Sequence, residues 1–419
     1  MTSNRSTHER ASGACTPNDA PFQPIGTARA SLAESAAELS ARHGGRDYQR
    51  ALSADIVRAL ETPVGVSVLG KEGLASSVIA CVPTAGGKSH IALSVAALLQ
   101  REAGLRVGWI AAKRELLRQA RAEIEKFGFE LDLRTISMFD SDPPQVDLVV
   151  FDEAHRDACT TAASLVARIR PTYAIGLTAT PWRGDGARLA YGHELHRCTI
   201  QQLQDDGYLA QYSHVAIEDW KPETVARTWL ADQERFGASI AFFRTGAEAR
   251  ACLDVLRRQD VRADLVHGGS DRESQLEAFA AGELDVLVAM GCLSEGYSAP
   301  WLRTVFARPA SRGPLIQMCG RALRPDPEVE TKYIVQARMA PTPFTRIARP
   351  LEQFMLRDGD WRALGATRDI DAIVARMRGM VARARADIPA FIAKSRGRVG
   401  PSAARAFRSN GNLNNNPIL

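Results

Sequence analysis

Short runs of apolar, mostly β-branched residues alternate with segments of helical period along most of this chain. In the first half, strand-like runs occupy 77–83, 106–112, 133–139, 146–153 and 173–180. Between them, KSHIALSVAALLQ at 88–100 and KRELLRQARAEIEKFG at 113–128 place apolar residues at helical spacing. Strand followed by helix, repeated, predicts parallel strands buried on both faces by crossover helices. We therefore expect an α/β domain over about residues 41–205.

A second series of the same kind begins after a polar stretch at 201–207. Its strand-like runs are 238–244, 263–269, 285–290, 303–309 and 332–338, and its helical segments are 248–259, 272–283 and 313–324. We expect a second α/β domain over about residues 215–345, which has no glycine-rich phosphate loop of its own. Two such domains with one loop predict a nucleotide held in a cleft between them.

The two ends of the chain lack this pattern. Residues 1–40 are rich in Ser, Ala, Thr and Pro and are expected to form a flexible, disordered arm, in which SLAESAAELSAR at 31–42 is a candidate short helix. Residues 346–419 are rich in Arg and Ala and end in SNGNLNNNPIL. They predict a basic helical extension followed by a disordered tail.

Composition places the chain among ordinary water-soluble proteins. It has 419 residues, 45% hydrophobic and 24% charged, which suits two or three domains. No stretch approaches the roughly 18 to 20 apolar residues of a membrane helix, and the N-terminus lacks the apolar run of a secretory signal. We expect a cytoplasmic protein without membrane contact. The seven cysteines include no C-x-x-C pair, so neither a disulfide framework nor a zinc cluster is indicated.

Basic charge is concentrated at the C-terminal end. Residues 362–419 carry eleven Arg or Lys against three Asp, which leaves 42 basic and 45 acidic residues in the rest of a chain of net charge +5. Such a tail is suited to neutralise nucleic-acid phosphates, and it is equally typical of a solvated helix with a disordered end.

VPTAGGKS at 82–89 lies between a predicted strand and a predicted helix. In that context the backbone N–H groups of the loop and the positive end of the helix face an anion. A phosphate loop of this kind would place Lys88 on the β- and γ-phosphates and Ser89 on Mg²⁺. A chance G-K-S is common, so the loop alone does not decide.

The sequence VDLVVFDEAH at 146–155 ends a predicted buried strand with two adjacent carboxylates, Asp152 and Glu153. Both lie at the carboxyl edge of the predicted sheet, where open α/β folds bind ligands. Asp152 suits the coordination shell of magnesium, and Glu153 suits polarising an attacking water. Two acids at a strand end also occur as mere surface polarity, but the upstream loop favours the catalytic interpretation.

The loop and the DEAH sequence, in this order, resemble the first two motifs of the superfamily 2 helicases and translocases of the DEAH-box kind. The first motif of that family commonly reads A-P-T-G-x-G-K-T, so the family pattern does not require glycine at position 82. Ala85 departs from the pattern, because it stands where the family has glycine, which tolerates positive φ better than alanine. The resemblance covers roughly residues 45–340. It implies two tandem RecA-like domains, an ATP cleft between them, and ATP and Mg²⁺ as cofactors, with Thr84, Gly86 and Gly87 in the binding loop.

Further segments of the first domain match the family in its own order. RDYQR at 46–50 resembles the segment that reads adenine, which implies Gln49 as the amide partner and Tyr48 as a stacking wall. LTATP at 177–181 resembles the third motif, in which Thr178 and Thr180 link the nucleotide site to strand binding. His155 would lie between that motif and the second domain.

Three segments resemble those that contact the nucleic-acid backbone in this family. They are AAKRELLRQA at 111–120, TIS at 135–137 and IAFFRTGAEA at 240–249. The resemblance implies that Lys113, Arg114, Thr135 and Arg244 lie on the nucleic-acid side.

The second domain contributes QMCGRALRP at 317–325, which matches the sixth motif, Q-x-x-G-R-x-x-R. In a helix, Gln317, Arg321 and Arg324 would project from one face. The resemblance implies that this face meets the γ-phosphate, where arginines contribute on the order of 10³ to 10⁵ in rate. Because Lys88 lies in the other domain, hydrolysis would require closure of the cleft.

The segment CLSEGYSAP at 292–300 resembles the fifth motif and implies nucleotide contacts by Glu295 and Gly296. Ser298 stands where the family has an aspartate that often contacts ribose. A hydroxyl still forms hydrogen bonds but carries no charge.

The fifth and sixth motifs look closest to the DNA-repair and phage-type branch of the family. We therefore expect an ATP-dependent helicase or translocase that acts on duplex or branched DNA rather than RNA, as a monomeric motor whose recruiting proteins the sequence does not identify. An RNA helicase and a nucleotide-gated DNA-binding subunit of a larger complex are the alternatives. Glu153 and the two arginines argue against a clamp without hydrolysis. A P-loop kinase would leave the second domain unexplained.

Overall fold

The computed structural model describes residues 31–62, 76–156, 160–182, 189, 191–290, 293, 299–357 and 360–363. The chain divides into two compact units, Met1–Ala363 and Leu364–Leu419, and both sheets belong to the first. Three of the residues singled out above, Glu295, Gly296 and Ser298, lie outside the described residues, as do most of the N-terminal arm and the basic tail.

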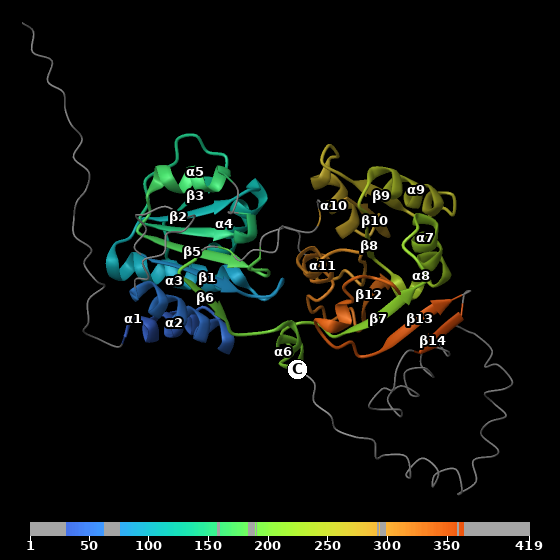
Figure 1. Cartoon of the computed structure of the whole chain (residues 1–419), viewed down its shortest axis with the longest axis horizontal. Coiled ribbons are helices and arrows are strands. Elements are labelled where there is room, and N and C mark those ends of the chain that lie inside the picture. The colour runs from blue at the N-terminus through green and yellow to red at the C-terminus, as the bar shows by residue number, and fades with distance from the viewer. Residues whose placement is uncertain are drawn as a thin grey trace, which may run out of the picture. The chain divides into compact units, whose positions relative to one another are not determined.

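The first sheet has six parallel strands in the order β3-β2-β4-β5-β1-β6 (Figure 1). Their bounds are β1 (Ser76–Cys81), β2 (Val107–Ala111), β3 (Leu133–Ser137), β4 (Leu148–Asp152), β5 (Tyr173–Thr178) and β6 (His193–His196). The helices are α1 (Leu32–Arg42), α2 (Asp47–Glu61), α3 (Lys88–Ala103), α4 (Arg114–Phe127) and α5 (Thr160–Ile169), with a short 3₁₀ turn at Ala154–Arg156.

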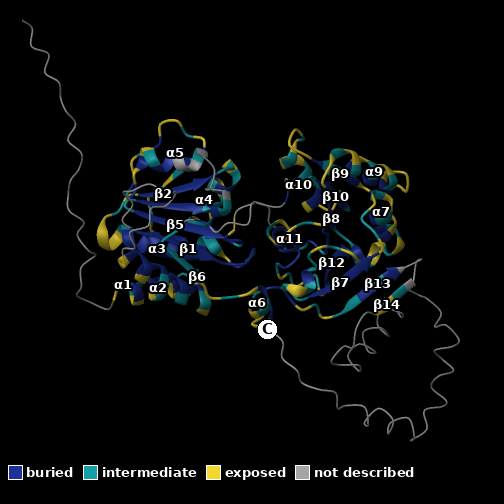
Figure 2. Ribbon diagram, viewed as in Figure 1, coloured by how far each residue is buried: buried dark blue, intermediate teal, exposed yellow. Residues whose placement is uncertain are grey.

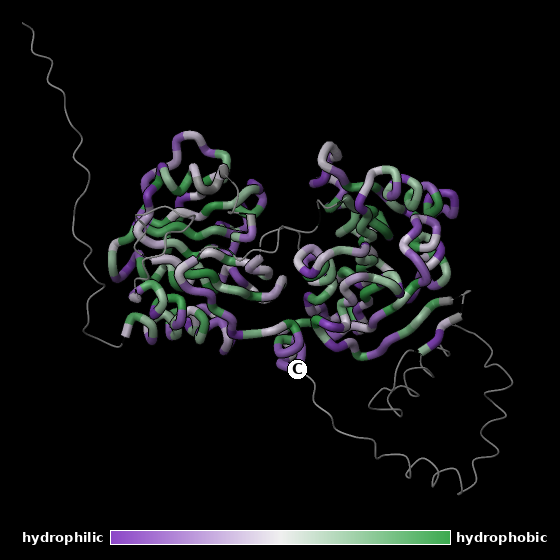
Figure 3. The backbone as a smooth tube through the Cα atoms, viewed as in Figure 1, coloured by the Kyte–Doolittle hydropathy of each residue, from purple (hydrophilic) through white to green (hydrophobic). Residues whose placement is uncertain are grey.

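Apolar residues on alternate positions of these strands form two separate cores. Val78 and Ala80 of β1 pack with α1, α2 and α3, whereas Ile79 and Cys81 pack with α5. The central strands are therefore buried on both faces, as Figure 2 shows in dark blue, and Figure 3 shows the matching hydrophobic strands. The prediction of a parallel sheet covered on both faces is confirmed.

The second sheet has eight strands in the order β14-β13-β7-β12-β11-β8-β10-β9. Their bounds are β7 (Tyr212–Ile217), β8 (Ser239–Phe242), β9 (Ala263–Val266), β10 (Val286–Ala289), β11 (Thr304–Phe306), β12 (Lys332–Ala337), β13 (Gln353–Arg357) and β14 (Asp360–Ala363). All neighbours are parallel except β13 and β14.

Helices cover both faces of this sheet as well. They are α6 (Ile200–Asp205), α7 (Pro222–Ala231), α8 (Gln233–Phe236), α9 (Gly246–Arg257), α10 (Arg272–Ala280) and α11 (Arg312–Cys319), with a 3₁₀ turn at Phe344–Arg346. Ile240 and Phe242 of β8 face the core shared with α6, α10 and α11, and Ala241 faces the core shared with α7 and α9. Among the described helices, none combines the length and apolarity needed to cross a bilayer.

The structure differs from the expected boundaries at both ends. The candidate short helix at 31–42 is present as α1, but it is not part of a disordered arm, because its Ala33, Ala36 and Leu39 are buried against α2 and α3. Residues 353–363 were expected beyond the second domain, but β13 pairs with β7 and extends its sheet.

His214 on β7 is a buried histidine of the second sheet. Its Nε2 lies 3.3 Å from Oε1 of Gln336 on the neighbouring strand β12. Burial lowers the pKa of His214 to about 4, although the hydrogen bond to Gln336 opposes this shift. The folded chain therefore holds this imidazole neutral.

We expect the free energy of unfolding to decrease as pH falls from 6.5 to about 4, because the unfolded chain binds a proton at His214 that the folded chain excludes. The folded pKa lies below the ordinary value, so this contribution is complete above pH 6.5 and is lost on acidification, by roughly 3 kcal/mol. Urea unfolding at pH 7 and pH 4.5 should show a smaller loss in His214→Gln than in the wild type. His267→Gln, at an exposed histidine, is the control. Equal acid sensitivity of wild type and His214→Gln would contradict this assignment.

Candidate active site

The phosphate loop connects the carboxyl end of β1 to the first turn of α3. β1 ends at Cys81 and α3 begins at Lys88, with Gly87 as its N-cap in the left-handed conformation at φ 71°. The left-handed backbone favours glycine at this position. A Cβ there would also lie 2.4 Å from Nε2 of Gln49, whose side chain would have to shift. The unpaired N–H groups of the first turn of α3 face the end of the loop.

Ala85, the departure from the family pattern, is left-handed at φ 66°. A left-handed conformation costs an L-residue roughly 1–2 kcal/mol. The loop therefore keeps the bend for which the family uses glycine, at the cost of local strain.

Gln49 and Tyr48 hold this loop from α2. Nε2 of Gln49 donates to the carbonyl oxygens of Gly86 and Gly87 at 3.4 and 3.2 Å, and its Oε1 accepts from the backbone N–H of Arg46 at 2.9 Å. The Tyr48 hydroxyl donates to the Gly86 carbonyl, and burial raises the pKa of Tyr48 to about 12. The adenine-reading roles expected of both residues stay predictions, because their polar groups are here engaged with the loop.

The DEAH sequence lies at the carboxyl end of β4, which runs beside β5. Nζ of Lys88 donates to Oε1 of Glu153 at 2.7 Å, and the two side chains are only 11% and 12% exposed. Glu153 has φ 55°, a strained backbone for a residue other than glycine. The strain and the ion pair together fix the Glu153 carboxylate beside the phosphate loop.

Local charges set the ionisation of the two carboxylates. Burial, followed by the neighbouring Glu153 charge, raises the pKa of Asp152 to about 7, while Lys88 acts in the opposite direction. Burial also disfavours the ionised form of Glu153, but Lys88 and His155 outweigh it and lower the pKa of Glu153. Glu153 is therefore a carboxylate at neutral pH, as a group that orients water requires.

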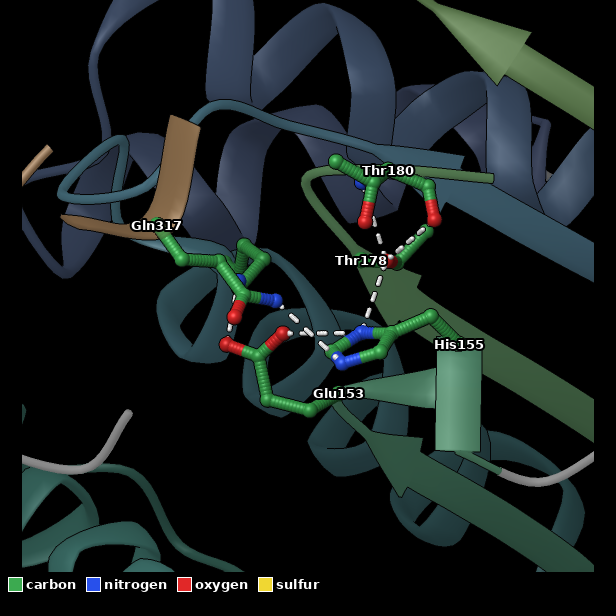
Figure 4. Close-up of polar contacts among 6 residues, drawn as sticks. Glu153, His155, Thr178, Thr180 and Gln317 are labelled. Carbon is green, nitrogen blue, oxygen red and sulfur yellow. Dashed lines mark hydrogen bonds and ion pairs between the residues drawn. The ribbon is translucent and has the colours of Figure 1, made fainter. Parts of the chain in front are cut away.

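His155 joins the carboxylate to the second domain (Figure 4). Its Nδ1 lies 3.4 Å from Oε2 of Glu153 and 3.4 Å from Oγ1 of Thr178, and its Nε2 lies 3.2 Å from the amide nitrogen of Gln317 on α11. An amide nitrogen only donates, so this contact favours the tautomer in which Nε2 accepts and Nδ1 carries the proton. The expected position of His155 between the third motif and the second domain agrees with these contacts.

The sixth motif is not one continuous helix. α11 ends at Cys319, so Gln317 is helical but Arg321 and Arg324 lie in the turns that follow, and the expectation of a single helical face is wrong. Gly320, which caps α11, packs against the phosphate loop: a Cβ there would lie 2.6 Å from Cβ of Thr84.

Lys88 and both arginines nevertheless line one cavity of about 540 Å³. Ser89, Asp152 and Glu153 line the same cavity. Arg321 is buried, and burial lowers the pKa of Arg324, a residue whose ordinary value is high enough to keep it charged. The cavity thus brings together candidate catalytic residues from the two domains.

This cavity fits a nucleoside triphosphate with a magnesium ion. Its volume lies within the roughly 300–1,000 Å³ typical of ligand sites. Lys88, Arg321 and Arg324 supply positive charge, and the Ser89 hydroxyl and the Asp152 carboxylate are oxygen ligands of the kind magnesium prefers. In the described part of the chain, the buried Thr84 Oγ1 has no hydrogen-bond partner, as expected of a group that awaits a ligand.

One cavity residue, Tyr208, had no signal in the sequence, and Arg46 was not singled out within the RDYQR segment that it begins. The Arg46 guanidinium lies 4.7 Å from the centroid of the Tyr208 ring, and both residues line the cavity. Tyr208 follows α6 in a short linker before β7. Only the folded chain brings that linker to α2, so no local motif marks Tyr208.

The residues expected on the nucleic-acid side fall into two groups. Arg114 and Arg244 are exposed, whereas Lys113 at the start of α4 and Thr135 on β3 are partly buried, and Oγ1 of Thr135 accepts from Arg121 at 2.7 Å. Thr178 and Thr180 are buried and hydrogen-bond to each other. Direct polymer contact by these two threonines is therefore not supported, and their contact to His155 suits a linking role.

Comparisons with known proteins agree with this arrangement. A family model described as the helicase conserved C-terminal domain matches residues 220–326. The candidate helicase 22 of Sulfolobus islandicus filamentous virus is 25% identical over 233 residues, 45% of this chain and 42% of that protein. The candidate ATP-dependent helicase IRC3 of Saccharomyces cerevisiae is 24% identical over 234 residues, 46% of this chain and 34% of that protein.

A 51.5 kDa protein of a Lactococcus phage is 27% identical over 262 residues, 54% of this chain and 58% of that protein. The chain therefore spans less than two thirds of the length of each of these relatives.

Among solved structures, the ATP-dependent Type ISP restriction-modification enzyme LlaBIII bound to DNA has a TM-score of 0.50 and 14% identity. The matched region covers 72% of this chain and 28% of the LlaBIII chain. This likeness supports the fold, two tandem RecA-like domains. The C-terminal domain model and the helicase-named relatives support a superfamily 2 helicase.

Proposed function

We propose that this chain hydrolyses ATP, with Mg²⁺ as cofactor, to move along or remodel duplex or branched DNA as a monomeric motor. The observation that carries the proposal is the convergence of Lys88, Glu153, Arg321 and Arg324 on one cavity. A binding site alone would require neither a positioned carboxylate nor two arginines from a second domain.

The residues of the cavity have separate roles in the proposed hydrolysis. The N–H groups of the loop and Lys88 bind the phosphates, and Ser89 and Asp152 hold the magnesium ion, which supplies charge neutralisation when bound. Glu153 orients water and accepts its proton. Arg321 and Arg324 stabilise the negative charge that develops in the transition state.

The His155 contacts provide a physical connection between hydrolysis and motion. Lys88 pairs with Glu153 in the structure, and phosphates would compete for the same ammonium group. A change at Glu153 passes to His155, and from there to Gln317 in the second domain. Because α11 carries Gln317 and leads into both arginines, the state of the phosphates biases how that segment sits against the cavity.

DNA is the proposed polymer because the fifth and sixth motifs look closest to the DNA-repair and phage-type branch, and because the related LlaBIII structure is a complex with DNA. The exposed side chains of Arg114 and Arg244 can contact phosphates, which occur in DNA and RNA alike. These contacts do not distinguish DNA from RNA, so the assay below compares the two polymers.

We expect DNA to stimulate ATP hydrolysis. Purified full-length protein would be assayed with no polymer, single-stranded DNA, duplex DNA, forked DNA and RNA at one salt concentration, because such binding is salt-dependent. The greatest stimulation is expected with duplex or forked DNA. Stimulation by RNA alone would assign the RNA helicase alternative, and equal turnover in every tube would refute the motor.

Lys88→Ala and Glu153→Gln should each reduce turnover by at least about 10²-fold, because they remove the phosphate ligand and the proton acceptor. Glu153→Gln should still bind ATP, which fluorescent nucleotide titration measures. Glu125→Gln, at an exposed glutamate on α4, is the matched control and should keep wild-type turnover. The free energy of unfolding of each variant, measured in urea, shows whether lost turnover reflects lost stability. This matters because Lys88→Ala leaves Glu153 buried without its cation. A fully active Glu153→Gln would exclude the proposed role.

Arg321→Ala and Arg324→Ala should bind nucleotide but lose turnover by on the order of 10³-fold, because the arginines act on transition-state charge. Arg346→Ala removes an exposed arginine of the same domain and should leave turnover unchanged. Single-turnover hydrolysis with bound ATP separates the chemical step from binding. Wild-type single-turnover rates in both variants would show that the two domains do not share this site.

A further inference from the structure

The edge of the first sheet brings together three side chains that the nucleotide site does not use. β6 lies beside β1 (Figure 1) and pairs with it in parallel. The register places Cys81 opposite His196. Paired residues point to the same face of a sheet, and residues two apart on one strand do so too. Glu194, two residues before His196, therefore lies on the face of Cys81 and His196.

Side-chain distances agree with this backbone argument. One ligand atom each from Cys81, Glu194 and His196 lies within 4.8 Å of the other two. Nε2 of His196 is 2.6 Å from Oε1 of Glu194. The Cys81 side is buried, whereas the His196 side chain is 54% exposed. The cluster is therefore open to solvent on one side and closed by the sheet on the other, which gives an ion a path of entry.

The donor set selects a type of ion. A thiolate, an imidazole and a carboxylate suit zinc and similar thiophilic divalent ions, whereas magnesium prefers oxygen ligands alone. Three protein ligands leave a fourth tetrahedral position for water. We propose that Cys81, Glu194 and His196 form a binding site for a thiophilic divalent metal ion, of which zinc is the type case.

This site is separate from the magnesium ligands of the nucleotide cavity. Cys81 belongs to the core face that packs with α5, while α3, which carries Ser89, packs on the opposite face of β1. None of the three proposed ligands lines the nucleotide cavity. Zinc binding is thus proposed independently of ATP and of hydrolysis.

The site adjoins the catalytic network through one strand. Cys81 pairs with His196 on one side and with Thr178 on the other, and Thr178 contacts His155. Cys81 is also the last residue of β1 before the phosphate loop. A metal ion bound by Cys81, Glu194 and His196 would connect the edge strand β6 to the start of the phosphate loop. Binding of the ion would release the proton of the Cys81 thiol.

The test uses full-length protein, reduced, freed of metal and kept in excess Mg²⁺ to occupy oxygen sites. Titration with Co²⁺ should produce a thiolate-to-cobalt charge-transfer band that saturates at one ion per chain and is abolished by Zn²⁺. Zn²⁺ should also raise the melting temperature, because an ion that binds only the folded chain stabilises it. Absence of the band, or a band that Zn²⁺ leaves unchanged, would overturn the proposal.

Variants identify the ligands. His196→Asn should weaken metal binding at least about tenfold, in the range that altered metal sites show, and Cys81→Ser should abolish the charge-transfer band. His196 is exposed, so its variant tests the site even if the buried Cys81→Ser fails to fold.

Cys198→Ser and His193→Gln are matched controls from the same segment. Cys198 lies beyond the end of β6, and His193 Nε2 instead lies 3.1 Å from the Thr62 carbonyl oxygen. Both controls should keep wild-type affinity for Zn²⁺. A loss of the cobalt band in Cys198→Ser, with the band intact in Cys81→Ser, would place the metal elsewhere and refute the assignment.

Discussion

The parallel pairing of β1, β4 and β5 is the constraint on which the candidate site depends. Parallel strands end at one edge of a sheet, so the phosphate loop, the DEAH sequence and the third motif must emerge side by side. The buried ion pair between Lys88 and Glu153 and the contact between His155 and Thr178 follow from that geometry. No single motif could create it, because each supplies only one side of the site.

Burial of Lys88 and Glu153 makes the charge of each depend on the other when the cavity holds no phosphate. Two charges withdrawn from water gain little net stability from each other, yet breaking a buried pair by removing one partner costs about 3–5 kcal/mol. Lys88 and Glu153 each compensate the other while phosphate is not bound, and Glu153 adds a strained backbone. A phosphate that competes for Lys88 thereby alters Glu153 directly. The ion pair would therefore couple occupancy of the cavity to Glu153, the residue proposed to orient water.

The sequence predicted the parts of this protein that are specified locally. Continuous apolar runs marked the central strands, and short motifs with fixed spacing marked Lys88, Asp152, Glu153 and the two arginines. What it missed depends on distant contacts. Gly320, at the end of the helix before Arg321, approaches Thr84, a residue of the other domain. Tyr208 enters the cavity from a linker, and β6, with the sequence HELH, has no apolar run that would mark a strand.

The same limit explains how a metal site escapes a search by spacing. A C-x-x-C pair reveals a site built within one turn, and its absence says nothing of ligands that neighbouring strands bring together. Cys81 and His196 are far apart in the sequence, and only the parallel register of β1 with β6 makes them neighbours. Thr178 lies on the other side of Cys81 by the same rule. The registers of β1 with its two neighbours therefore place the cluster at the sheet edge and Thr178 on the same face, so an ion bound by the proposed metal site would lie one strand away from the contact between Thr178 and His155.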